Sequence, residues 1–272
     1  MSQSLSSSPR RGAAAGALHW SGIAWFAVAA VGQVAFIGFI LAFYGVRTAQ
    51  GNFAAWNDKP LIDGYIAGDH AGNFVFAAHV LLASIVTLAG LMQLTPALRR
   101  ALPTLHRWTG RSFIIIGVFM ALSGVWLTLV RGTSLSTISS VAILINAVLI
   151  LTFAGVAWRH AVKSRFEQHR QWAMRTFMVV SGVWFLRVGI MGWVLVNQGP
   201  VGMTNTLSGP ADMVLTFGSY LIPLALLELY FAAGRSANGL LKLFTAAVVF
   251  AATVFTAAGV FGTIAFMWGP YL

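Results

Sequence analysis

Two histidines lie at corresponding places in the chain, each beside arginines and just ahead of a long apolar stretch. They are His106 and His169. The neighbouring arginines are Arg107, Arg111, Arg170 and Arg175. Two imidazoles on different helices can bind a haem iron from opposite sides, and arginines can bind its propionates. The pattern therefore predicts one b-type haem, with His106 and His169 as the iron ligands.

Small residues lie close to both histidines. Gly110 and Ala173 each follow one of them by four residues, on the same helix face and one turn deeper. We expect these two positions to leave room for the porphyrin ring. His106 itself lies almost at the start of its helix, whereas a haem ligand usually lies further inside.

The same residues have two other interpretations. The cations can simply anchor the cytoplasmic ends of membrane helices, with Trp108 and Trp172 in the aromatic belt. Alternatively, the arginines and histidines can hold a phosphate, a lipid headgroup or another anion at the helix N-termini, where the helix dipole favours negative charge. The sequence leaves all three interpretations open.

A second group of polar residues falls within apolar stretches in the outer half. It consists of His79, Asn146 and Arg187. An arginine inside a membrane span costs several kcal/mol unless it faces a partner or a wet cavity, so Arg187 marks a candidate site. Asp69 and Asp212 are possible counter-ions. We interpret the group as the lining of a quinone or proton pathway; an interhelical hydrogen bond is the alternative role for His79.

Missing residue types exclude several other chemistries. The chain has no cysteine, which excludes disulfides, thiolate catalysis and iron–sulfur clusters. None of its lysines lies in the middle of an apolar stretch, so a retinal Schiff base is excluded. The last two apolar stretches contain no histidine, which argues against a membrane zinc hydrolase. No glycine-rich nucleotide-binding loop follows a predicted strand.

The elements that position these residues are predicted from composition. Of 272 residues, 58% are hydrophobic and only 8% are charged, so the bilayer is the solvent of this chain. Apolar runs of about twenty residues favour helices over barrel strands. We therefore expect an all-α bundle of about seven spanning helices, at residues 20–44, 73–95, 108–131, 136–159, 173–197, 212–232 and 240–267.

The charges predict the orientation of the bundle. The net charge is +11, but the cations cluster in alternate loops, which indicates a membrane topology rather than a nucleic-acid partner. Thirteen of the seventeen cations fall inside if the N-terminus is cytoplasmic. We expect a disordered cytoplasmic tail over residues 1–19 and a single membrane domain over 20–272. The expected location is the cytoplasmic, or inner, membrane of a bacterium.

Three segments together carry a family resemblance. They are the stretch from His79 to Gln93 and the two motifs at residues 105–111 and 169–175. Together they resemble the bacterial predicted membrane proteins of the DUF2306 family, over a core of about residues 73–200. The helix arrangement is also similar, more distantly, to the b-type transmembrane cytochromes. That likeness implies one haem at His106 and His169 and leaves His79 without a partner histidine on the next helix.

Two functions follow from these observations. The first is a single-haem b-type redox protein that exchanges electrons with quinone in the membrane. The second is a non-catalytic binding, transport or complex-associated protein, in which the cytoplasmic histidines and arginines hold an anionic lipid or solute. In the second interpretation Arg187 lines the pathway. Neither function requires a nucleic-acid partner.

Overall fold

The computed structural model describes residues 12–59 and 62–272, and every regular element in these residues is helical. The α-helices are α1 (Ala13–Phe39), α2 (Val46–Ala49), α3 (His70–Gln93), α4 (Pro96–Ala101), α5 (Pro103–Leu129), α6 (Thr137–Val162), α7 (Phe166–Val180), α8 (Gly182–Asn197), α9 (Pro210–Arg235) and α10 (Gly239–Gly262). Two π-helical segments, η1 (Ile40–Gly45) and η3 (Thr263–Trp268), and two 3₁₀ segments, η2 (Phe53–Asp58) and η4 (Gly269–Tyr271), complete them. The all-α prediction is confirmed.

Six of the helical segments are long and apolar enough to cross a membrane, and a seventh is broken. The six are Ala13–Ala49, His70–Gln93, Pro103–Leu129, Thr137–Val162, Pro210–Arg235 and Gly239–Tyr271. The seventh consists of α7 and α8, which are bent by 54° at the break between them. The predicted number of spans is therefore reached only if this bent pair is one span.

The first helix begins earlier than expected. Residues 13–19 fall in the predicted tail, yet α1 begins at Ala13 and continues through η1 and α2 to Ala49. The alanine-rich sequence after Gly12 favours this extension, since alanine has the highest helix propensity. The remainder of the predicted tail, residues 1–11, lies outside the described residues.

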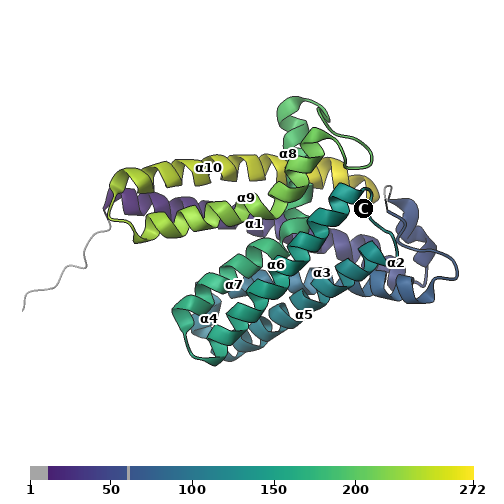
Figure 1. The fold of residues 1–272 in the computed structure, drawn as a ribbon, viewed down its shortest axis with the longest axis horizontal. Helices are drawn as coiled ribbons and strands as arrows, with labels where there is room; N and C mark the ends of the chain where they lie inside the picture. Colours follow the sequence, from purple (N-terminus) through teal and green to yellow (C-terminus); the bar gives the residue numbers. More distant parts are fainter. Residues whose placement is uncertain (1–11, 60–61) are drawn as a thin grey trace, which may run out of the picture.

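The helices form two arms (Figure 1). One, the three-helix arm, contains α1, α9 and α10, with α1 and α10 packed along much of their length. The other, the four-helix arm, contains α3, α5, α6 and α7, each packed on the next along the chain. The arms diverge toward the ends that carry most of the arginines, which we call the cation-rich end. The opposite end, with the described loop residues at 50–59 and 62–69 and the loops at 130–136 and 198–209, is the outer end of the predicted topology.

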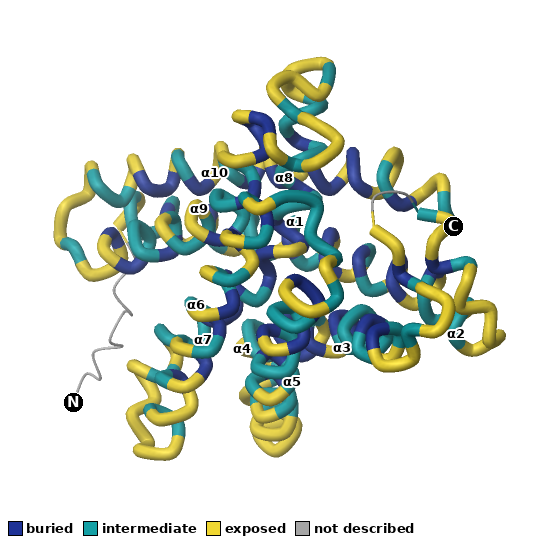
Figure 2. The backbone as a smooth tube through the Cα atoms, turned by 45° about the vertical axis from the view of Figure 1, so that its right-hand side comes forward, coloured by how far each residue is buried: buried dark blue, intermediate teal, exposed yellow. Residues whose placement is uncertain are grey.

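Aromatic side chains fill the core where the two arms meet. Phe36, Phe39, Trp184 and Trp268 are all nearly inaccessible. Figure 2 shows that the exposed stretches of the tube lie mainly at the loops and at the helix ends. The Trp268 ring stacks on Phe36 at 5.5 Å between ring centroids and on Phe39 at 5.6 Å. Large aromatic rings in offset contact bury much apolar surface at this junction and hold the two arms together rigidly.

The break between α7 and α8 is stabilised by polar side chains from other helices. Ser181 lies at the break, and its hydroxyl oxygen accepts a hydrogen bond from the Gln33 amide at 3.2 Å. The Asn146 amide donates to the carbonyl oxygen of Val179 at 3.1 Å. A carbonyl at a helix end in an apolar setting needs such a partner, and the Asn146 contact supplies one for Val179. The Gln33 contact holds the Ser181 side chain at the bend.

Candidate functional site

The three-helix arm encloses a long apolar cavity that reaches the junction with α7 and α8. Its volume is about 420 Å³, which is within the usual range for small-molecule sites. The lining residues come from α1, α7, α8, α9 and α10, with Leu94 and Pro96 at the cation-rich end. None of the described residues that line it is an aspartate, glutamate, lysine or arginine. The cavity therefore suits an apolar ligand.

The shape of the cavity is elongated. Its lining includes Val214 near the start of α9 and Tyr230 near the end of that helix. At 1.5 Å per residue this separation is roughly 24 Å along α9, compared with a hydrocarbon core of about 30 Å. Such a cavity matches a long chain lying along the membrane normal rather than a compact solute.

Several lining side chains also face the surroundings of the protein. Ile23 is 42% exposed, Ile222 is 53% exposed and Val214 is 61% exposed. Because these residues lie within spans, their exposed sides face the apolar part of the bilayer. Part of the cavity lining, on α1 and α9, is therefore also exposed to the bilayer.

Few polar groups touch the cavity. His19 and Tyr230 lie toward the cation-rich end, Ser219 lies in the middle of α9, and Thr256 lies on α10. Just outside the wall, Arg175 of α7 pairs with Glu228 of α9, with nitrogen–oxygen distances of 2.5 and 2.9 Å. The polar end of a bound amphiphile is expected near His19 and Tyr230.

The structure places His106 in the first turn of α5 and His169 in the first turn of α7, at the same end of the four-helix arm. Nδ1 of His169 lies 3.0 Å from the carbonyl oxygen of Ala157. Since a carbonyl can only accept, this contact places the proton on Nδ1 and leaves Nε2 with a free lone pair. Nδ1 of His106 is buried and has no hydrogen-bond partner among the described residues.

The space expected for a porphyrin is occupied on one side. Gln93 donates to the carbonyl oxygen of His106 at 3.0 Å and to the hydroxyl of Thr109 at 2.7 Å. A β-carbon added at Gly110 would lie 2.9 Å from Oε1 of Gln93. A ring packed against Gly110 would have to displace this hydrogen-bonded side chain, so the predicted position of the porphyrin ring does not fit the structure.

The four arginines of these motifs do not form one group. Arg107 donates to the hydroxyl of Thr104 at 3.1 Å, and the Arg111 guanidinium lies 5.1 Å from the Trp108 ring centroid. Arg170 pairs with Glu167 on the same helix in an exposed contact, which contributes little. Arg175 is bound to Glu228. Of these four arginines, Arg107 and Arg111 therefore lack a carboxylate partner among the described residues.

The residues of the second predicted group each make a separate contact and do not bind one another. Nδ1 of His79 lies 2.7 Å from the Ser123 hydroxyl of α5, which is the interhelical hydrogen bond considered as its alternative role. Asn146 holds the end of α7, as described above. Arg187 donates to the carbonyl oxygen of Val183 at 2.9 Å. Neither Arg187 nor His79 lines the long cavity.

The two expected counter-ions of Arg187 are bound elsewhere. Asp69 pairs with Arg131 at 2.9 Å. Asp212 is buried near the start of α9, where its Oδ2 accepts from the backbone nitrogens of Thr204 at 2.8 Å and Gly209 at 3.0 Å. Arg187 therefore makes no ion pair with any described carboxylate.

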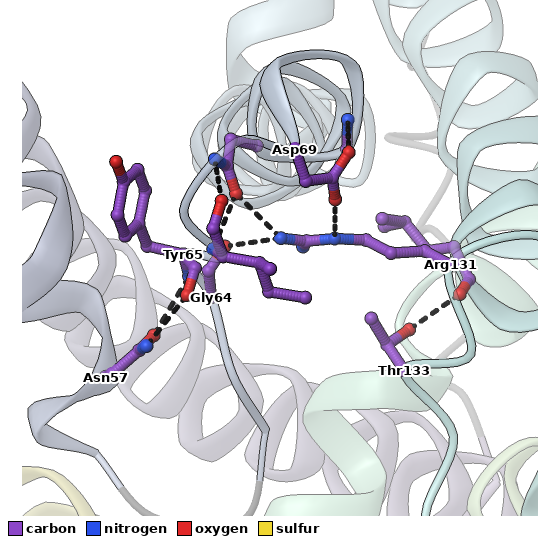
Figure 3. A network of polar contacts seen from close by, with 10 residues as sticks. Asn57, Gly64, Tyr65, Asp69, Arg131 and Thr133 are labelled. Carbon is purple, nitrogen blue, oxygen red and sulfur yellow. Dashed lines mark hydrogen bonds and ion pairs between the residues drawn. The ribbon is translucent and has the colours of Figure 1, made fainter.

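Arg131 fastens the outer loop to the four-helix arm (Figure 3). Its side chain is only 3% exposed and also donates to the Gly64 carbonyl at 3.1 Å and to the Asn73 amide oxygen at 2.8 Å. Asn57 closes the same network through two hydrogen bonds to the backbone of Tyr65. The backbone N–H of Gly72 and the Arg131 guanidinium lower the pKa of Asp69, which keeps this carboxylate charged.

The long cavity could not be predicted from the sequence. The sequence feature that corresponds to the cavity is a set of small residues on the helices that line it: Gly189, Gly218, Ser219 and Ala252. Small residues more often allow close helix packing, and Gly259 shows that use, since a β-carbon there would clash with the Val188 carbonyl oxygen. Only the three-dimensional arrangement separates the two outcomes.

Comparison with known proteins identifies a family for this chain. Residues 76–231 match the family model described as "Predicted membrane protein (DUF2306)". The matched region runs from α3 to the last third of α9, so it covers the four-helix arm, the bent pair and one wall of the cavity. A search of curated proteins gave no match, and neither did a search of solved structures.

Proposed function

Because the chain belongs to the DUF2306 family of predicted membrane proteins, we propose that it acts within the bilayer as a binding protein for an amphiphile with a long apolar tail. The tail occupies the cavity of the three-helix arm, and the polar head lies near His19 and Tyr230. This is the non-catalytic binding function considered from the sequence, with the ligand site in a different place.

The elongated, uncharged cavity is the observation that carries this proposal. Burial of apolar surface favours binding by about 25 cal/mol per Å² when the surface comes from water. A lipid tail comes from an apolar bilayer, so shape matching and dispersion contacts with the rings of Trp25, Phe26 and Phe185 must supply the preference. The lining residues that are exposed to the bilayer give such a tail a route that avoids water.

The test measures retained amphiphiles. The purified chain is exchanged into detergent, and native mass spectrometry counts bound molecules. Ala252→Trp fills the cavity from α10, whereas Ala251→Trp adds the same ring at an exposed position outside the lining. We expect Ala252→Trp to lose the bound molecule and Ala251→Trp to keep it. Equal retention by both variants contradicts the proposal.

The same experiment distinguishes the sources of the tail. Organic extraction of the retained molecule followed by mass analysis separates a phospholipid from an isoprenoid quinone. A quinone also has a characteristic ultraviolet absorbance that disappears on reduction with borohydride. A quinone makes the redox interpretation the next question, whereas a phospholipid supports a lipid-binding or lipid-transport role.

The position of His106 and His169 at the same end of the four-helix arm favours a second candidate, the single-haem b-type redox protein. In this proposal Nε2 of His169 and a nitrogen of His106 bind the iron, while Arg107 and Arg111 are free to bind propionates. Gln93 must then move away from Gly110. The test is an oxidised-minus-reduced visible spectrum with haem quantified as pyridine haemochrome. A stoichiometric b-type spectrum lost in His169→Ala supports it, and a flat spectrum from folded protein rejects it.

A further inference from the structure

A second, smaller cavity, which we call the bend cavity, lies at the break between α7 and α8. Its volume is about 40 Å³, and its lining residues come from α1, α3, α5, α6, α7 and α8 and from Ser181 at the break itself. It therefore lies where α1 of the three-helix arm meets the four-helix arm. Phe177 is the one described residue that lines both this cavity and the long one, so the two spaces have almost separate walls.

Two polar atoms of this lining are buried without a hydrogen-bond partner among the described residues. They belong to Gln33 and Trp184, each of which is 1% exposed. The Gln33 amide nitrogen donates to the Ser181 hydroxyl at 3.2 Å, which leaves Oε1 as an unused acceptor. Trp184 can only donate, through its ring N–H, and this donor is unused. Burial of a polar group without a partner is costly, so a cavity bordered by two such groups suits a polar occupant.

The Trp184 indole faces the part of α1 that carries Gln33. A β-carbon added at Gly32 would lie 2.7 Å from Cζ2 of Trp184, an atom on the same edge of the indole as Nε1. Ser181 and Thr87 add hydroxyl groups to the lining. The Thr87 hydroxyl donates to a backbone carbonyl oxygen one turn earlier at 2.6 Å and can still accept. The bend cavity therefore combines a free acceptor, a free donor and two hydroxyls.

We propose that the bend cavity is a binding site for water, in which internal water molecules donate to Oε1 of Gln33 and accept from Nε1 of Trp184. A buried water needs about 10–15 Å³ of cavity volume and about two to four polar partners, so this cavity has room for about three molecules. None of the described lining residues is an aspartate, glutamate, lysine or arginine, which favours a neutral molecule over an ion. The site joins α1 to α8 at the bend and does not depend on the function proposed above.

X-ray radiolytic labelling of the full chain in nanodiscs tests for this water. X-rays convert water to hydroxyl radicals, and a radical formed from a buried water modifies the side chains around it, at rates that mass spectrometry measures. Phe36 and Phe113 line the bend cavity and are 4% and 5% exposed, whereas Phe39 and Phe43 line neither cavity and are 2% and 0% exposed. We expect Phe36 and Phe113 to be labelled severalfold faster than Phe39 and Phe43. Equally slow labelling of all four overturns the proposal.

Variants distinguish bound water from a local opening of the fold. Gln33→Met keeps the length of the side chain but removes the acceptor, so the labelling rate of Phe113 should fall toward that of Phe39. Gln50→Met makes the same change at an exposed position of the outer loop and should leave both rates unchanged. If Gln33→Met fails to fold, Ala83→Val, which adds two methyl groups to the cavity wall, should give the same loss. Labelling of Phe113 that stays unchanged, or that rises together with that of Phe39, contradicts the site.

Discussion

Individual arginines in this chain have different roles, although the sequence presents them alike. Arg131 is buried with Asp69 and fastens the outer loop, Arg175 joins α7 to α9 through Glu228, and Arg187 has no carboxylate partner among the described residues. The unusual position of Arg187 could be predicted from hydropathy alone. Its partners could not, because pairing depends on which helices face one another, and both expected counter-ions are bound elsewhere.

The pairing of Asp69 with Arg131 makes the outer loop sensitive to acid. The pKa of Asp69 is lowered in the folded protein, so its contribution to stability is complete above the ordinary aspartate pKa of about 3.9 and is lost as the pH falls through the lowered value. At neutral pH, Asp69→Asn should mimic this loss and speed hydrogen exchange in residues 62–69. Asp63→Asn, which removes an exposed carboxylate without an ion pair, is the control. Equal exchange in the two variants contradicts the role of the pair.

The lowered pKa of Lys59 gives a second prediction. Because its pKa is lowered to about 8 by burial and by Arg187, the lysine loses its charge as the pH rises through that value. Competitive acylation followed by mass spectrometry should show a higher Lys59 pKa in Arg187→Gln and an unchanged one in Arg235→Gln. An unchanged value in both variants would show that Arg187 does not act on Lys59.

The helices could be predicted well where apolarity alone defines them and poorly where side-chain packing does. Six spans follow from runs of apolar residues. The break at Ser181 does not, because the sequence remains apolar on both sides of it and the bend depends on Asn146 and Gln33 from distant helices. The early start of α1 was missed because its first turns are less apolar than a span but still favour a helix.

The crossing of α8 and α10 depends on a glycine. A β-carbon at Gly259 would clash with the backbone carbonyl of Val188, which cannot rotate away. Gly259→Ala should therefore destabilise the protein by about 1–3 kcal/mol through overpacking. Gly155→Ala in α6 meets nothing within 4 Å and should be neutral or slightly stabilising. Thermal unfolding in detergent compares them, and an unchanged midpoint for Gly259→Ala would contradict this helix crossing.

At the scale of the whole molecule, the two arms create a feature that neither could form alone. The membrane fold and its family follow from hydropathy and motifs, but the cavity arises because α9 stands off from the tightly packed α1 and α10 while α7 and α8 close the space. The cavity lies on the three-helix arm, whereas the histidine and arginine motifs, on which the predicted sites were based, lie on the four-helix arm. Histidines and arginines are conspicuous in a sequence, whereas an apolar space between apolar helices is not.

Photo-crosslinking from the acyl chain of a bound lipid shows whether a lipid tail lies inside this cavity. A phospholipid with a photoreactive group in its acyl chain is incorporated into nanodiscs with the protein, and labelled peptides are mapped by mass spectrometry. We predict labelling of the cavity face, at Phe26, Ser219 and Leu226, and its loss in Ala252→Trp but not in Ala251→Trp. Labelling confined to outward-facing residues such as Phe250 and Val254, and unchanged in Ala252→Trp, would contradict the account.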